Sequence, residues 1–181
     1  MNLKKISLII AIMTLIGILA SCSAAPTTTT SKVDVVASAS VVDNAAAFEK
    51  AISKEGTWII AITKDLTIDK DLVLDGDFKN GKKDTEGNEL LQRKIGLYTQ
   101  DTDRNITARL TLVAKSLTIK SVKGSVEHGT FRGDLYVAAK DFRLIDATID
   151  GNVYFLNDEI KASFTMDETS KVSGAQEVKA N

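Results

Sequence analysis

The chain has 181 residues, with 23 Lys and Arg against 24 Asp and Glu, and a formal charge of −1. This length fits one globular domain with a tail, and the balanced charge excludes a basic field that would gather phosphates, so we expect no nucleic-acid partner. The single Cys and single His exclude a disulfide framework and a Cys/His zinc cluster.

Residues 1–21 predict a secretory signal. Lys4 and Lys5 precede an uncharged, mainly apolar run from Ile6 to Ala20. A spanning helix needs about 20 apolar residues, and this run is shorter and ends at small residues. Residues 22–32 begin with Cys22 and continue with small and hydroxylated side chains and the only Pro, which predicts a flexible tether.

The boundary sequence Leu19-Ala20-Ser21-Cys22 resembles the bacterial lipobox. The resemblance implies cleavage before Cys22, a diacylglycerol on its thiol, and an exported protein anchored to the membrane through its N-terminal lipid. It places the protein at the cell surface or the outer membrane, depending on the type of envelope. The alternative is an ordinary secreted protein with a stray Cys after the cleavage site.

Residues 33–56 predict an N-terminal segment and a capping helix. Asp43 and Asn44 offer an N-cap, the following AAAFEKAISKE contains good helix formers, and Gly56 provides a stop. Phe48 and Ile52 are four residues apart, so the helix has one narrow apolar face to bury.

Residues 57–174 contain short β-type runs that repeat. Four windows of twelve residues, which start at 59, 110, 135 and 153, align without gaps and carry apolar residues at positions 1, 3, 8 and 10. A polar corner between the two runs predicts strand, corner, strand in each window. The offsets of 25 and 18 between the last three windows are typical of stacked repeats that cannot bury their apolar faces alone.

The first offset, of 51 residues, needs a further, irregular repeat. It can be built from LVLDGDF and RKIGLYTQ, with the polar loop KNGKKDTEGNE as a surface excursion between them. Residues 175–181 are expected to form a polar C-terminal tail.

This repeat architecture resembles the right-handed parallel β-helix, or pectin-lyase-like, family. The resemblance implies a mainly β fold: a short right-handed parallel β-helix (β-solenoid) with an N-terminal capping α-helix. The alternative is an antiparallel β-sandwich, with Gly-Asp at 133 and Gly-Asn at 151 as hairpin turns. We favour the solenoid, because hairpins do not explain why the corner chemistry repeats.

Period-two alternation assigns window positions 1 and 3 to the core and positions 2 and 4 to the outside. One continuous core is predicted from Leu112, Leu117, Val137, Phe142, Leu144, Val153 and Phe155. The outward residues, which we expect the monomer to shield with residues 33–42 or the helix, are Ile60, Ile62, Val113, Tyr136, Tyr154 and Leu156. The functional alternative is a ligand or partner face, with a sugar platform on Tyr136, Tyr154 and Leu156.

Catalytic chemistry is sparse in the sequence. The acids Asp69, Asp71, Asp75 and Asp77 lie close in sequence, and we interpret them as solvated turns. DGDFKNG at 75–81 begins like a calcium loop, but Lys79 stands where a third ligand should be. His128 is interpreted as a lone surface His, which would serve as a general base only beside a nucleophile or an orienting acid. Because phosphate-loop and nucleophile motifs are missing, we expect no catalytic residue, no metal and no cofactor.

The function predicted from the sequence is that of a lipid-anchored bacterial envelope protein with a structural or binding role, with a glycan or an envelope protein as partner. Two alternatives remain open. One is a small polysaccharide-processing enzyme of the β-helix type, and the other is a self-assembling β-helix scaffold.

Overall fold

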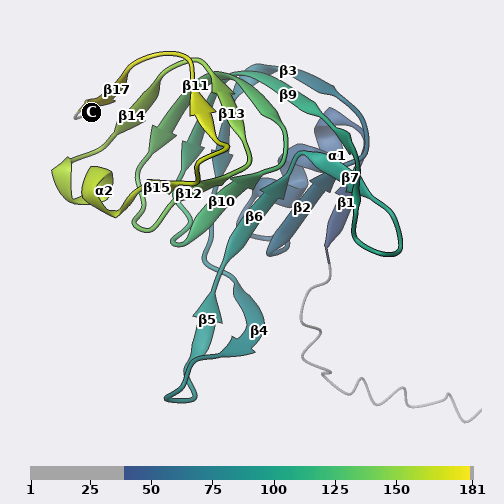
Figure 1. The fold of residues 1–181 in the computed structure, drawn as a ribbon, viewed down its shortest axis with the longest axis horizontal. Coiled ribbons are helices and arrows are strands. Elements are labelled where there is room, and N and C mark those ends of the chain that lie inside the picture. Colours follow the sequence, from purple (N-terminus) through teal and green to yellow (C-terminus); the bar gives the residue numbers. More distant parts are fainter. Residues whose placement is uncertain (1–38, 180–181) are drawn as a thin grey trace, which may run out of the picture. The chain divides into compact units, whose positions relative to one another are not determined.

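The computed structural model describes residues 39–179, which form a mainly β fold with two large parallel sheets (Figure 1). Sheet A has the order β1 (Ser40–Val42), β2 (Ile59–Ile62), β6 (Arg93–Gly96), β10 (Gly124–Glu127), β12 (Arg143–Ile145) and β15 (Thr165–Met166). Sheet B contains β3 (Leu66–Leu74), β9 (Thr111–Ile119), β11 (Thr130–Val137), β13 (Thr148–Asp150), β14 (Val153–Phe155), β16 (Lys171–Val172) and β17 (Gln176–Val178).

From β2 onward the chain visits sheet A and then sheet B in turn, and we call each such visit to both sheets a passage. Every strand pair within the two sheets is parallel. Successive passages stack in register, so that Leu117, Leu135 and Val153 are neighbours on adjacent strands of sheet B. The parallel pairing confirms the coarse prediction from the repeats, and the antiparallel alternative is wrong for these sheets.

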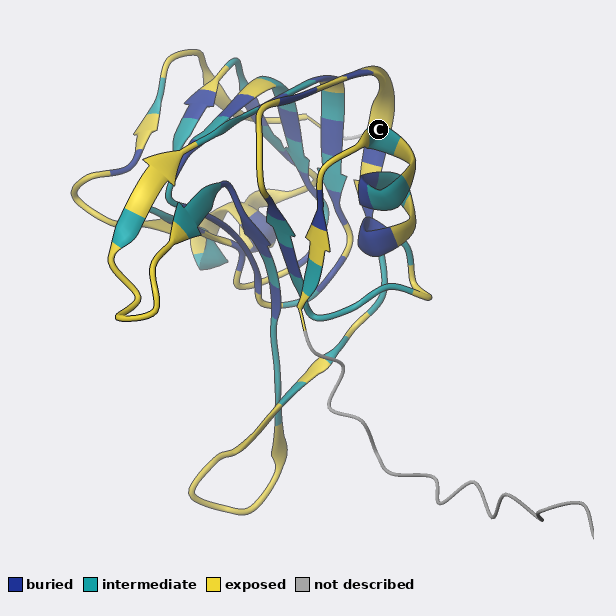
Figure 2. Cartoon of the chain, turned by 90° about the vertical axis from the view of Figure 1, so that its right-hand side faces the viewer, coloured by how far each residue is buried: buried dark blue, intermediate teal, exposed yellow. Residues whose placement is uncertain are grey.

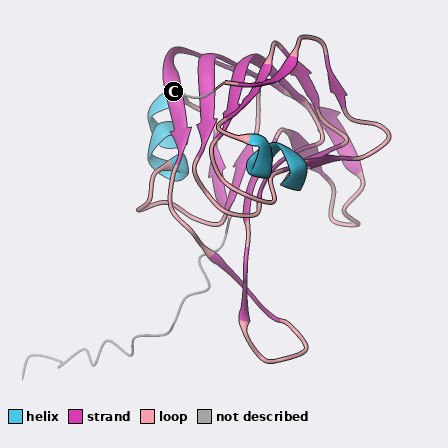
Figure 3. Ribbon diagram, turned by 90° about the vertical axis from the view of Figure 1, so that its left-hand side faces the viewer, coloured by secondary structure: helices cyan, strands magenta, loops and turns pink. Residues whose placement is uncertain are grey.

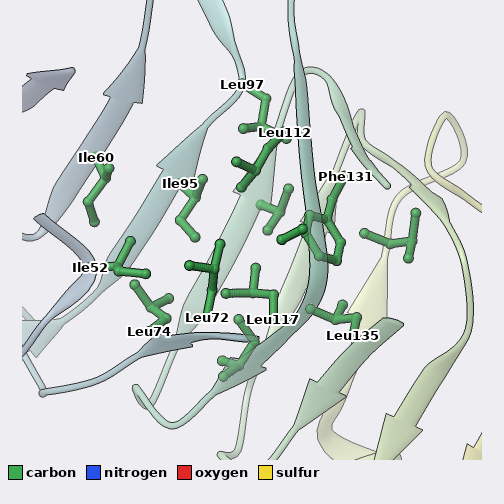
Figure 4. Packing of buried hydrophobic residues seen from close by; sticks show 14 of the residues in the cluster. Ile52, Ile60, Leu72, Leu74, Ile95, Leu97, Leu112, Leu117, Phe131 and Leu135 are labelled. Atoms are coloured by element: carbon green, nitrogen blue, oxygen red, sulfur yellow. The ribbon is translucent and has the colours of Figure 1, made fainter. Parts of the chain in front are cut away.

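The interior between the two sheets is one hydrophobic cluster (Figure 4). Side chains from both sheets meet there, such as Ile95 from β6 and Leu117 from β9. All seven residues of the predicted core are at most 1% exposed, which confirms that prediction.

The predicted register of the windows is wrong in three places. In the first window Ile60 and Ile62 are fully buried, not outward, because every residue of β2 is apolar and alternation cannot fix its phase. The second half of the window at 110 pairs with the first half of the window at 135, since Leu117 lies opposite Leu135. In the last window the second run is a helix, α2 (Asp158–Ser163), whose N-cap is Asn157.

The Gly-Asp sequence at 133 is a bend inside a strand and not a hairpin turn. Gly133 has φ 142° and interrupts the register of β11 against β9. A Cβ on Gly133 would lie 2.2 Å from the carbonyl oxygen of Ala114, and one on Gly151 would lie 2.1 Å from that of Gly133. Glycine recurs at this bend because adjacent strands approach too closely there for a side chain.

Two antiparallel hairpins interrupt the passages. The polar loop expected after residue 78 is the hairpin of β4 (Lys79–Lys83) and β5 (Glu89–Leu91), which extends from the sheets and is mostly exposed (Figure 2). A second hairpin, β7 (Tyr98–Gln100) and β8 (Ile106–Arg109), follows β6 and was not predicted.

The predicted capping helix is present as α1 (Ala45–Ile52), which contacts β1, β2 and β3 (Figure 3). The side chain of Asn44 accepts a hydrogen bond from the backbone N–H of Ala47, as an N-cap does. Phe48 and Ile52 are buried as predicted. The helix therefore covers the N-terminal end of the core.

The fully buried Arg93 of β6 fastens the end of α1 to the sheets. Its guanidinium donates to the backbone carbonyls of Ala51 in the last turn of the helix and of the C-cap Ser53, and to those of Asp75 and Gly76 after β3. Burial lowers the pKa of Arg93 to about 10, which leaves the side chain charged at neutral pH.

The C-terminal segment is more ordered than a tail. Within residues 175–181, β17 pairs with β14 in parallel register and its residues are exposed. A polar composition hid the strand, because an edge strand exposes most of its side chains to solvent.

Candidate functional site

The predicted site residues Tyr136, Tyr154 and Leu156 lie in one open groove on the outer face of sheet B. Tyr136 and Tyr154 are register partners on β11 and β14, so they stand side by side. Their ring centroids are 5.1 Å apart with an angle of 34° between the planes, so the two rings stack partly face to face.

The two tyrosine rings differ in what covers their remaining faces. On the side of β17, the ammonium of Lys179 lies 4.5 Å from the ring centroid of Tyr154. On the side of β9, the register partner of Tyr136 is the short Thr118. A groove of about 460 Å³ is lined by Thr118, Tyr136 and Tyr154, and Tyr136 is half-buried, so part of its ring is accessible.

A row of polar residues borders this groove, two positions before the tyrosines. Ser116 is the register partner of both Asp71 and Asp134. Asp71 accepts a hydrogen bond from the Ser116 hydroxyl at 2.7 Å, and Asp134 accepts two from the backbone and side chain of Asn152 at 3.1 and 3.0 Å. The carboxylates are thus held at fixed positions on either side of Ser116.

The charges lining the groove balance. Its lining contains two acids, Asp71 and Asp134, and two bases, Lys115 and Lys179, whose formal charges cancel. Lys115 forms an ion pair with Asp69 at 3.4 Å. An accessible aromatic face beside two carboxylates and without excess charge suits a ligand with apolar C–H faces and hydroxyl groups.

The expected shielding of the outer face is wrong. Ile60 and Ile62 belong to the core, whereas Tyr136 and Tyr154 are half-buried and Leu156 is 37% exposed. The segments expected to cover them lie elsewhere, because β1 pairs with β2 and α1 contacts β1, β2 and β3. Residues 33–38 of the expected cover lie outside the described part of the chain.

A second polar cluster, which the sequence did not reveal, lies on the outer face of sheet A. Lys94 and Glu127 form an ion pair at 2.9 Å with side chains only 19% and 7% exposed. The Ser125 hydroxyl donates to the same carboxylate at 2.8 Å. Burial alone would lower the pKa of Lys94, but the hydrogen bond and charge of Glu127 outweigh it and raise that pKa.

His128 is not the lone surface residue that we expected. Its Nδ1 lies 3.0 Å from Oδ2 of Asp146, which also pairs with Arg109, and its ring meets that of Tyr98 edge-on at 4.7 Å. The hydrogen bond from His128, and then the bond and charge of Arg109, lower the pKa of Asp146. His128 and Asp146 share a left-handed backbone conformation, with φ of 61° and 50°. The only signal in the sequence was their spacing of 18 residues, the same as that between Leu117 and Leu135.

The acids around DGDFKNG do not gather into one site. Asp69 pairs with Lys115, Asp71 bonds Ser116, and Asp77 accepts from the backbone of Val122. Among residues 39–179, no three His, Cys, Asp or Glu side chains converge as a metal site would require.

The predicted lipidation site, Cys22, lies outside the described residues, as do the signal and tether predictions. In the part of the chain that the structure describes, no helix is both long and apolar enough to cross a membrane.

Comparison with known proteins returned no matching family model, no matching curated protein and no matching solved structure.

Proposed function

We propose that this protein is a lipid-anchored component of the bacterial envelope whose β domain binds a neutral glycan in the groove beside Tyr136. One observation carries the proposal: an accessible aromatic face lies next to two carboxylates that neighbouring strands hold in place. A pyranose would stack its C–H face on Tyr136 and donate hydroxyl hydrogen bonds to Asp71 and Asp134.

The balanced charge of the groove favours a neutral glycan over an acidic one. Two ammonium groups offset two carboxylates, so an acidic polysaccharide gains no net attraction and its own carboxylates would meet Asp71 and Asp134. A neutral, hydroxyl-rich glycan meets no such repulsion.

We further propose that the domain is a short right-handed parallel β-helix with α1 as its N-terminal cap. All-parallel pairing and the alternation between two sheets support this assignment. So does the constant spacing of 18 residues that relates Leu117, Leu135 and Val153.

The lipid anchor rests on the lipobox at Cys22. The signal at residues 1–21 would export the protein, and lipidation would hold it at the cell surface or the outer membrane, with residues 23–38 between the lipid and the described domain. Mass spectrometry of the N-terminal peptide tests this: we expect a diacylglyceryl mass on Cys22. An unmodified N-terminus at another position would reject the anchor without affecting the glycan proposal.

The binding proposal is tested on an array of neutral and acidic oligosaccharides with the full chain. We expect neutral glycans to be retained, and Tyr136→Ala to abolish retention while lowering the free energy of unfolding by only about 1 kcal/mol. Tyr98→Ala, on the outer face of sheet A, is the control and should leave binding intact. Retention of the same glycans by Tyr136→Ala would reject the groove as their site.

A polysaccharide-processing enzyme is a second candidate because of the spacing of the two carboxylates. Asp71 and Asp134 belong to strands separated by one intervening strand, so their backbones lie about 9.6 Å apart. Inverting glycosidases hold their two carboxyl groups about 6.5 to 9.5 Å apart, a separation that side chains on these two strands could adopt. Slow cleavage of an oligosaccharide by the wild-type chain, lost in Asp134→Asn, would favour this candidate. An oligosaccharide that the wild-type chain leaves uncleaved would reject it.

A further inference from the structure

The C-terminal end of the core is open, in contrast to the end that α1 covers. The side chains of Met166, Val172 and Val178 occupy the register positions next to the buried Leu144, Ile149 and Phe155. Met166 is nevertheless 37% and Val178 40% exposed, and Val172 is partly exposed. Within residues 39–179, no strand pairs with the outer edges of β15, β16 and β17.

The edge strand β17 is short and has charged residues, and the Lys161 ammonium of α2 donates to the backbone carbonyl of Gln176, but the strand has no inward-pointing charge, proline or bulge. Monomeric proteins guard an edge with short strands, charged side chains, inward-pointing charges, prolines or bulges. Here the residue that points toward the core is Val178, and the charged residues Glu177 and Lys179 lie on either side of it. An open edge with an apolar inward side chain is a template for another strand.

The sequence of β17 is complementary to itself in one register only. In an antiparallel pair related by a two-fold axis perpendicular to the sheet, facing residues must point to the same side. Pairing centred on residue 177 would set Glu177 against Glu177, and pairing centred on 179 would set Lys179 against Lys179. Pairing centred on Val178 sets Glu177 against Lys179 of the partner subunit twice and brings the two Val178 side chains together.

We propose that two copies of this chain associate end to end through β17, with the two-fold axis at Val178. The dimer extends sheet B across both copies and brings the two open ends of the core into contact. Because α1 covers the other end, the assembly closes at two copies and does not grow into a filament. This inference does not require glycan binding, although Lys179 also lines the groove on the outer face of sheet B.

A charge exchange tests both the dimer and its register. Sedimentation of the full chain over a concentration series should show a monomer–dimer equilibrium. Glu177→Lys alone and Lys179→Glu alone each set like charges opposite one another and should weaken the dimer by about tenfold. The double variant Glu177→Lys/Lys179→Glu should restore it. A wild-type chain that stays monomeric at all concentrations would overturn the proposal, and failure of the double variant to recover would overturn the register.

Cross-linking provides a second measurement that does not depend on weakening the dimer. In Val178→Cys the two new thiols face each other across the axis, and oxidation should link the copies covalently. Val73→Cys is the matched control, because Val73 is a similarly exposed valine, 37%, on β3. The wild-type chain reports any linking through Cys22. Equal yields from Val178→Cys and Val73→Cys would contradict the proposed axis.

Discussion

The outer faces of the two sheets carry different kinds of side chains. On sheet A, Lys94, Glu127 and Ser125 bond one another and are mostly buried, and Tyr98 of the second hairpin lies against Gly96, where Lys94 and Tyr98 border a groove of about 600 Å³. On sheet B, Tyr136 and Tyr154 face an open groove. The difference follows from the connections between the strands. The hairpin of β7 and β8, which follows β6, supplies Tyr98, whereas no hairpin follows β11 or β14.

The comparison teaches which side chains the fold depends on. A buried charge whose partner is removed costs several kcal/mol, so the paired groups on sheet A contribute to stability. A half-exposed aromatic pair contributes less, about 0.5 to 1.5 kcal/mol. Substitutions on the two faces should therefore differ in stability and in binding.

The largest effect is expected in the core that both faces share. Phe142 is fully buried, and its ring stacks with that of Phe164 at a centroid distance of 6.1 Å. Phe142→Ala should lower the free energy of unfolding, measured with urea, by about 3 to 5 kcal/mol. A loss below about 1 kcal/mol would show that Phe142 is not a core residue.

On sheet A, Glu127→Gln should cost about 3 kcal/mol, because it leaves the ammonium of Lys94 partly buried without its counter-ion. The double variant Glu127→Gln/Lys94→Met should regain much of that loss. Glu86→Gln at the exposed tip of the first hairpin is the control and should change little. Equal losses in the single and double variants would show that the unpaired ammonium of Lys94 is not the cause of the loss.

The cluster around His128 should give a smaller, pH-dependent effect. Asp146→Asn removes the bonds to His128 and Arg109 and should cost about 1 kcal/mol near neutral pH. Because the folded pKa of Asp146 is lowered, its contribution is present above the ordinary value of 3.8 and is lost as the pH falls through the folded pKa. The difference between wild type and Asp146→Asn should shrink between pH 6 and pH 3, and a difference that grows would contradict this sign.

The sequence predicted the parallel β repeats, the helix at 45–52 and the seven core residues, because apolar spacing and a cap carry those signals locally. It missed the phase of β2, where Ile59 and Ile60 are alike in hydrophobicity. Tyr136 and Tyr154 could be paired from their spacing of 18, but the position of the covering hairpin could not, since it depends on distant contacts. The Lys94–Glu127 and His128–Asp146 pairs likewise join separate passages.

The most direct test fills the proposed groove without removing anything. Thr118→Tyr should extend the tyrosine row onto β9 and occupy the accessible face of Tyr136, with a change in stability within about 0.5 kcal/mol. Thr67→Tyr, an exposed position on β3, is the matched control. In titrations of the full chain with a neutral oligosaccharide retained on the array, we predict that Thr118→Tyr loses binding while Thr67→Tyr keeps it. Unimpaired binding by a folded Thr118→Tyr would contradict the account.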